Sequence, residues 1–108
     1  MTLSFSSTKY SIVYKENEAL VLVTGHAGYA DEGFDIVCAS ISTACILSAN
    51  LIEHLKLGYN IIDVQSEKGY FKLQVKTDNE IVLGIIQNLE CHLDELQKQN
   101  PNNLKKKK

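Results

Sequence analysis

The sequence contains no arginine and no tryptophan, and it has one proline among its 108 residues. Arginine is the side chain best suited to bind phosphate groups. The densest positive charge is the terminal run Lys105–Lys108, and without it seven lysines face thirteen acidic residues. A body with this negative balance matches a phosphate backbone poorly, so we expect the folded domain not to bind nucleic acid.

Cysteine is also scarce, and the three cysteines Cys38, Cys45 and Cys91 are odd in number with no CxxC spacing. This pattern fits neither a disulfide framework nor a zinc site, so we expect thiols, no metal and no cofactor. The segment Met1–Phe5 has neither a basic stretch nor an apolar run. We therefore expect no secretory signal and a cytoplasmic protein.

Long hydrophobic runs are missing as well. The longest uncharged segment covers residues 36–52, and it is interrupted by four hydroxyl side chains and Asn50. A membrane-spanning helix needs about 20 predominantly apolar residues. We therefore expect no membrane partner, and interpret this segment as a helix buried on most of its faces.

Two hairpins are predicted from alternation and turn residues. Residues 8–14 alternate with period two, and residues 19–24 form an apolar run typical of a central strand covered on both faces. Residues 60–64 and 70–75 flank the turn sequence Ser66–Gly69. The seven residues 27–33 lack periodicity, and we interpret them as an exposed mobile loop.

Two helices complete the plan. Apolar or small residues recur at helical spacing from Val37 to Leu55, and Thr77–Glu80 is a capping-box sequence that opens a second amphipathic helix. The order strand, strand, helix, strand, strand, helix predicts an α+β fold, a two-layer sandwich of a mixed sheet and two helices. We place one domain at residues 1–100 and a disordered, lysine-rich tail at 101–108.

Cys38 and His26 are the candidate reactive pair. If Asp35 or its neighbour caps the first helix, Cys38 falls in the first turn, where unpaired N–H groups and the helix dipole favour a thiolate. The backbone N–H groups near Cys38 and Ala39 would then serve as an oxyanion hole. His26 ends a predicted central strand, and the loop can bring its imidazole over the helix start to act as base.

Asp35 and Ser42 share a helical stripe with Cys38, because they lie three residues before it and four after it. Asp35 either orients His26 or caps the helix. Ser42 hydrogen-bonds the reactive pair or its own backbone. By itself, a Cys and a His twelve residues apart are a weak signal, since most buried cysteines are inert packing groups.

A resemblance changes this balance. The run GHAGYADEGFDIVCASIS at residues 25–42, with Gly25-His26-Ala27, Gly33 and Asp35 through Cys38, resembles the signature of the ribosomal-processing cysteine protease family (Prp). The rest of the chain is similar to that family in length and in the order of its elements.

The resemblance implies an endopeptidase that removes the amino-terminal extension of large-subunit ribosomal protein twenty-seven, bL27. It implies His26 and Cys38 as the catalytic dyad, Asp35 and Ser42 as supporting residues, and a flexible substrate loop between the dyad residues. Gly25 would let a substrate backbone approach closely, Gly28 and Gly33 would act as hinges of the loop, and Ala27 would belong to the same substrate loop. The resemblance also implies a homodimer.

Two other functions remain open at this stage. One is a catalytically inactive, ribosome-associated binding module that docks through its lysine tail. The other is a thiol-based hydrolase or redox sensor with a small-molecule substrate, although no resolving cysteine lies at a useful spacing.

Overall fold

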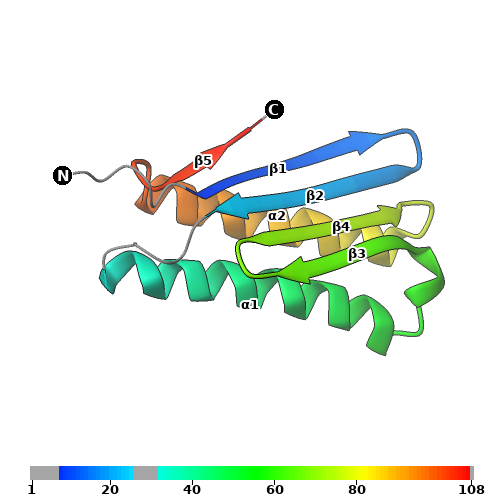
Figure 1. The fold of residues 1–108 in the computed structure, drawn as a ribbon. Helices are drawn as coiled ribbons and strands as arrows, with labels where there is room; N and C mark the ends of the chain where they lie inside the picture. Colours follow the sequence, from blue (N-terminus) through cyan, green and yellow to red (C-terminus); the bar gives the residue numbers. More distant parts are fainter. Residues whose placement is uncertain (1–7, 26–31, 108) are drawn as a thin grey trace.

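The computed structural model describes residues 8–25 and 32–107, with side chains described from Ile36 onward in the second segment. The elements are β1 (Thr8–Lys15), β2 (Glu18–Gly25), α1 (Glu32–His54), a 3-10 turn η2 (Gly58–Asn60), β3 (Ile61–Glu67), β4 (Tyr70–Lys76), α2 (Glu80–Gln99) and β5 (Leu104–Lys106). Figure 1 shows their arrangement. The predicted ββαββα order is confirmed, and a fifth strand follows it.

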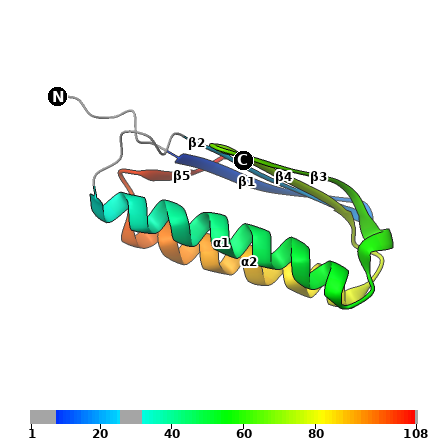
Figure 2. The ribbon, with the colours of Figure 1, turned by 60° about the horizontal axis from the view of Figure 1, so that its bottom comes forward.

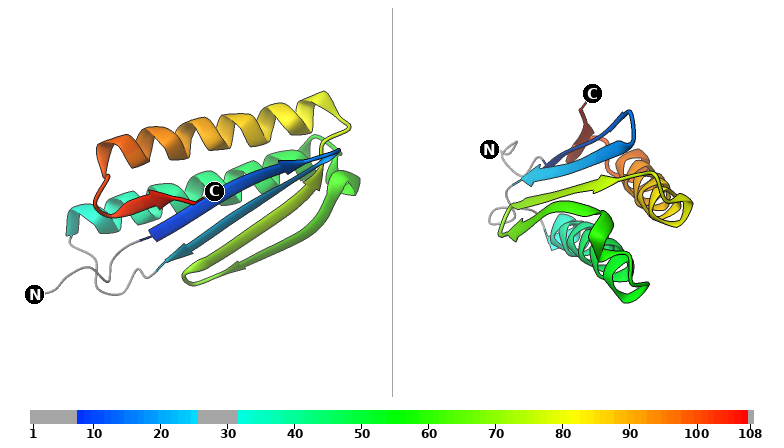
Figure 3. Two further views of the ribbon diagram at one scale, coloured as in Figure 1. Left: turned by 90° about the horizontal axis from the view of Figure 1, so that it is seen from above. Right: turned by 90° about the vertical axis from the view of Figure 1, so that its right-hand side faces the viewer.

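The strands form one sheet in the order β3-β4-β2-β1-β5. β5 runs parallel to β1, and the other pairs are antiparallel. The sheet is therefore mixed, as predicted. Both helices lie side by side on one face of it, and no element of residues 8–25 or 32–107 covers the opposite face (Figure 2, Figure 3). These two layers confirm the predicted α+β sandwich.

The core lies between the helices and the inner face of the sheet. β2 is the third of five strands, but only its alternate residues Ala19, Val21 and Val23 are buried. The intervening residues Leu20 and Leu22 are half-buried on the uncovered face. The prediction that this strand is covered on both faces is therefore wrong, because the fold has only two layers.

Helix α1 differs from its prediction in two ways. It begins at Glu32, so Gly33 belongs to the helix and not to the predicted loop. It is also buried on one stripe only. The stripe comprises Ile41, Cys45, Ala49 and Ile52, whereas Ile36 is 73% exposed and Leu47 is 61% exposed.

The segment Ile36–His54 is long and apolar enough to cross a membrane, judged by length and composition. In this fold its buried stripe packs on the sheet. The outer face of α1 is thus an apolar surface that no described element covers.

Helix α2 begins two residues later than the capping-box sequence predicts, and it has a different cap. The Asn79 side chain accepts hydrogen bonds from the backbone N–H groups of Ile81 and Val82, at 2.8 and 3.3 Å. Thr77 therefore does not cap the helix as the capping-box pattern implied. Asn is among the best N-cap residues, so the shift of two positions costs the helix nothing.

The carboxyl-terminal segment corrects the predicted disordered tail. Leu104, Lys105 and Lys106 pair with the first three residues of β1, and Leu104 is fully buried. The backbone N–H of Thr8 donates to the Asn103 carbonyl at 2.8 Å, and the N–H of Lys107 donates to the Tyr10 carbonyl at 2.7 Å. Backbone pairing and one buried leucine hold the segment to the sheet.

A charged cluster explains how Lys106 is accommodated in β5. The ammonium group of Lys106 lies 3.1 Å from a Glu90 oxygen and 3.0 Å from an Asp94 oxygen of α2. The buried Tyr10 hydroxyl donates to Asp94 at 2.6 Å, and the Tyr14 hydroxyl donates to Glu90 at 2.9 Å. The cluster ties β1, α2 and β5 together.

Candidate active site

A cavity of about 240 Å³ opens beside Cys38. Four parts of the fold form its walls: the start of β1, the end of β2, one face of α1 and the β3–β4 hairpin. The lining residues are Thr8, Val23, Gly25, Cys38, Ile41, Ser42, Cys45, Ile46, Ser66, Glu67, Gly69, Tyr70 and Phe71. The cavity therefore joins the end of a central strand to a helix that carries a thiol.

Cys38 is half-buried and is the seventh residue of α1. The prediction that it lies in the first helical turn is wrong, because the helix begins before Asp35. Dipole effects fall off within the first turn of a helix. The N–H groups of Cys38 and Ala39 are also bound to carbonyls four residues earlier in a regular helix. They are thus unavailable for the predicted oxyanion hole.

Gly25 lies in the cavity wall, and the other half of the predicted dyad follows it in the sequence. It is the last residue of β2 and not part of a loop, and it lines the cavity directly before His26 in the chain. His26, Ala27 and Gly28 lie outside the described residues. Asp35 is in α1, but its side chain is also outside the described part.

Close backbone packing fixes the end of β2. The Gly25 N–H donates to the Gly69 carbonyl at 3.0 Å. A Cβ on Gly25 would meet Thr8 Oγ1 at 2.4 Å and Thr8 Cα at 2.9 Å, and one on Gly69 would meet the Gly25 carbonyl oxygen at 2.5 Å. The sequence suggested that Gly25 lets a substrate backbone approach closely. In the structure, the group packed closely against Gly25 is Thr8.

Ser42 and Cys45 follow Cys38 on the same side of α1. Ser42 is exposed and lines the cavity, as its predicted supporting role requires. Cys45 is 1% exposed, and burial raises the pKa of its thiol to about 12. Cys45 is thus a neutral packing group, as predicted for a thiol facing the core.

Sequence reasoning predicted only Gly25, Cys38 and Ser42 among the lining residues, and it missed the polar residues Thr8, Ser66, Glu67 and Tyr70. Thr8 was assigned only to a strand, and Ser66, Glu67 and Tyr70 only to a hairpin. Their place in the cavity depends on pairing between distant segments, such as Thr8 with Gly25 and Thr24 with Tyr70. No local sequence signal marks such residues.

The sequence model of the family described as cysteine protease Prp matches residues 8–105. The chain belongs to this family. The Prp match spans every residue that lines the cavity beside Cys38. As a member of the Prp family, the chain is a cysteine protease.

Solved structures have the same fold. The chain is similar to the ribosomal processing protease Prp from S. aureus in complex with a substrate peptide, at 24% identity and a TM-score of 0.78, over 93% of this chain and 97% of that one. It is also similar to the complex of Prp from S. aureus with a covalently linked product peptide, at 28% identity and a TM-score of 0.72, over 93% of this chain and 99% of that one. The similarity to SMU.848 from Streptococcus mutans has 24% identity and a TM-score of 0.76, over 94% of this chain and 92% of that one. No curated protein matches significantly.

Proposed function

We propose that this chain is a ribosomal-processing endopeptidase that removes the amino-terminal extension of large-subunit ribosomal protein twenty-seven, with Cys38 as nucleophile and His26 as base. One observation carries the assignment of residues. The cavity beside the Cys38 thiol is bounded by Gly25, whose carbonyl is bonded directly to the nitrogen of His26.

The other two cysteines are less suited to the role. Cys45 is buried and its raised pKa keeps the thiol protonated. Cys91 is exposed on α2 and lines a groove between the two helices, away from the end of β2. A thiol is a nucleophile only as a thiolate, which needs a nearby base. Cys38 is the thiol beside the strand end that leads to His26.

The proposed reaction follows acyl transfer to sulfur. The His26 imidazole takes the Cys38 proton, and the thiolate attacks the carbonyl carbon of the scissile peptide bond. The tetrahedral intermediate collapses to a thioester as the imidazolium gives its proton to the departing amine. Water, deprotonated by the same imidazole, then hydrolyses the thioester and restores the thiol.

Asp35 and Ser42 are proposed as supporting residues. Ser42 lines the cavity one helical turn after Cys38, so its hydroxyl can hydrogen-bond a group held there. Asp35 lies one turn before Cys38 on α1, where a carboxylate facing His26 would orient the imidazole. We assign both to positioning and neither to bond making.

The partners and setting are part of the same proposal. The S. aureus structures hold a substrate peptide and a covalently linked product peptide, which supports a peptide substrate here. The three cysteines are thiols, which supports a cytoplasmic location. With the lysines of β5 included, the chain still has a formal net charge of -2, which argues against nucleic acid as a partner.

The decisive experiment incubates the protein with the extended ribosomal protein from the same cell and follows its mass. The wild-type protein and a Cys91→Ala control should shorten it at one bond, and Cys38→Ala and His26→Ala should leave it intact. Binding without cleavage by the wild type would instead indicate the inactive binding module.

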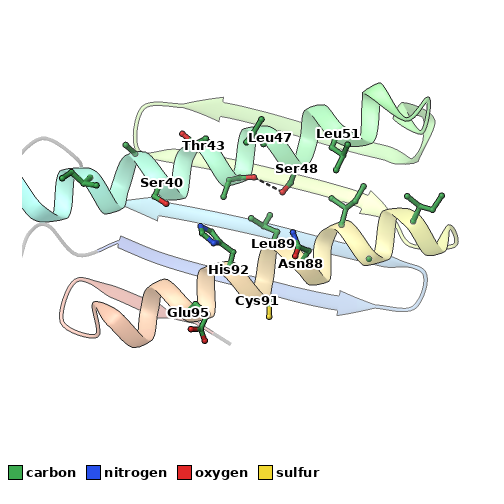
Figure 4. A pocket seen from close by; sticks show the side chains of 16 residues that line it. Ser40, Thr43, Leu47, Ser48, Leu51, Asn88, Leu89, Cys91, His92 and Glu95 are labelled. Carbon is green, nitrogen blue, oxygen red and sulfur yellow. Dashed lines mark hydrogen bonds between the residues drawn. The ribbon is translucent and has the colours of Figure 1, made fainter.

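We also propose a homodimer, formed through the outer faces of the helices. Figure 4 shows the groove of about 1050 Å³ between them, with Leu47 and Leu51 on α1 and Leu89 and His92 on α2. In a two-fold dimer the same patch is used on both subunits, so an uncharged apolar patch is buried against an uncharged apolar patch. Residues 36–52 carry no charge.

Sedimentation equilibrium tests this dimer. We expect the wild type to sediment as a dimer and Leu47→Asp as a monomer, because the variant would bury a carboxylate in the apolar interface. Asn50→Asp is the matched control, since Asn50 is exposed on α1 outside the groove. A monomeric wild type at micromolar concentration would contradict the proposal.

A further inference from the structure

Strand β3 is the terminal strand of the sheet on the side nearest α1 (Figure 1, Figure 3). It pairs with β4, and no other strand in the described part of the chain pairs with its outer edge. An irregularity in the register between Ile61 and Asp63 limits the regular part of this edge to Asp63–Glu67. Alternate residues of such a strand present unpaired N–H and C=O groups to any extended chain beside it.

This edge leads into the cavity beside Cys38. Ser66 and Glu67, at the end of β3, line that cavity together with Cys38, Ser42 and Ile46. The three α1 residues are spaced four apart and therefore form one stripe along the helix. A chain running along β3 toward Glu67 would thus arrive at the thiol.

The space between this edge and α1 suits the side chains of an added strand. Val64 and Ser66 pair with the buried residues Leu73 and Phe71, so they point to the helix side of the sheet. Val64 is 44% exposed there, and Ile46 of α1 is 43% exposed. Every second side chain of an added strand would cover these apolar groups.

We propose that an extended segment of the substrate binds as an additional strand along Asp63–Glu67 of β3, which delivers its scissile bond to Cys38. This inference rests on the proposed peptidase function and adds the mode of recognition. The occupant is an extended peptide because backbone groups provide the contacts, while every second side chain packs on Val64 and Ile46. Backbone recognition of this kind is β-strand addition.

A backbone scan tests the inference directly. The probe is a fluorescent synthetic peptide that spans the end of the extension and the first residues of the mature ribosomal protein. A series carries one N-methyl group at each position in turn, and binding to full-length Cys38→Ala protein is measured by anisotropy. We expect Kd to rise at least tenfold at alternate positions of one segment, and less than twofold between them.

The outcomes separate the inference from the function on which it rests. A scan without alternation, or a peptide that does not bind, overturns the added strand. The proposed function fails separately, if wild-type protein leaves the extended ribosomal protein uncut. If the wild-type protein cleaves the ribosomal protein but the N-methyl series shows no alternation in Kd, the protease function is supported and the added strand is wrong.

A variant on the protein side provides a second measurement. Val64→Lys places a flexible cation on the proposed edge, and Val13→Lys is the matched control, since Val13 is 36% exposed on β1. We expect Val64→Lys to raise KM at least fivefold with kcat within twofold of wild type, and Val13→Lys to change neither. Loss of kcat at unchanged KM would overturn the proposal. Circular dichroism melting verifies folding, and the backbone scan decides if Val64→Lys does not fold.

Discussion

Replacement of Leu104 by alanine tests whether the carboxyl-terminal strand is part of the fold. Leu104 is fully buried and pairs with Thr8 at the edge of the sheet. Truncation of a buried leucine to alanine costs about 2–5 kcal/mol, because it removes packed methyl groups and leaves a cavity. For a domain of this size each kcal/mol lowers the melting temperature by about 4–8 °C. We therefore expect Leu104→Ala to lower Tm by about 10 °C or more.

Differential scanning calorimetry of the full chain measures this change. Lys107→Ala is the control, because Lys107 is exposed and contributes its backbone N–H to Tyr10, which the substitution retains. Exposed substitutions usually change stability by less than about 0.5 kcal/mol. If Leu104→Ala and Lys107→Ala both have the same Tm as the wild type, the segment is a solvated tail and our assignment of β5 is wrong.

Three further predictions concern single side chains. Iodoacetamide at pH 7.5 should modify Cys38 in the folded protein and leave Cys45 unmodified, as read by peptide mass spectrometry, because Cys45 is buried and its pKa is raised to about 12; modification of Cys45 at the rate of Cys38 would refute this. Asn79→Ala should cost about 1 kcal/mol in urea unfolding through loss of the α2 cap, and Thr77→Ala less than half of that; the reverse order would restore Thr77 as the cap. The third prediction concerns Asp94. Partial burial raises the pKa of this carboxyl group, but hydrogen bonds from Tyr10 and Lys106 lower it by more, so the net pKa lies below its usual value. The stabilisation by Asp94 is present above the unfolded value of about 4 and is lost as pH falls through the lower folded value. Wild type should therefore exceed Asp94→Asn in Tm at pH 7, with a difference that shrinks as the pH falls below the unfolded value of about 4.

The two hairpins could be predicted because their signals are local. Period-two alternation in residues 8–14 and the turn sequence Ser66–Gly69 depend on neighbours a few positions apart. The structure has β1 and β2 joined at Asn17, which adopts a positive φ of 62°, and β3 and β4 joined at Gly69, with a φ of 77°. Turn residues that tolerate such angles are visible in the sequence.

The ends of the elements were harder to predict. Helix α1 begins at Glu32 in a stretch with few apolar residues, so no hydrophobic periodicity marks its first turn. This error moved Cys38 into the first turn and suggested oxyanion donors that the helix already uses. A difference of four residues between the helix start that follows an Asp35 cap and the observed start thus changed the expected chemistry at the nucleophile.

The order of the first four strands and the two helices could be predicted from residue types at short spacing, and so could the segment at residues 25–42 that resembles a protease signature. Long-range contacts were needed to show that Leu104–Lys106 complete the sheet, that Ser66 and Glu67 line the Cys38 cavity, and that no described element covers the outer face of α1. These features depend on contacts between residues far apart in the chain, which only the folding of the backbone brings together.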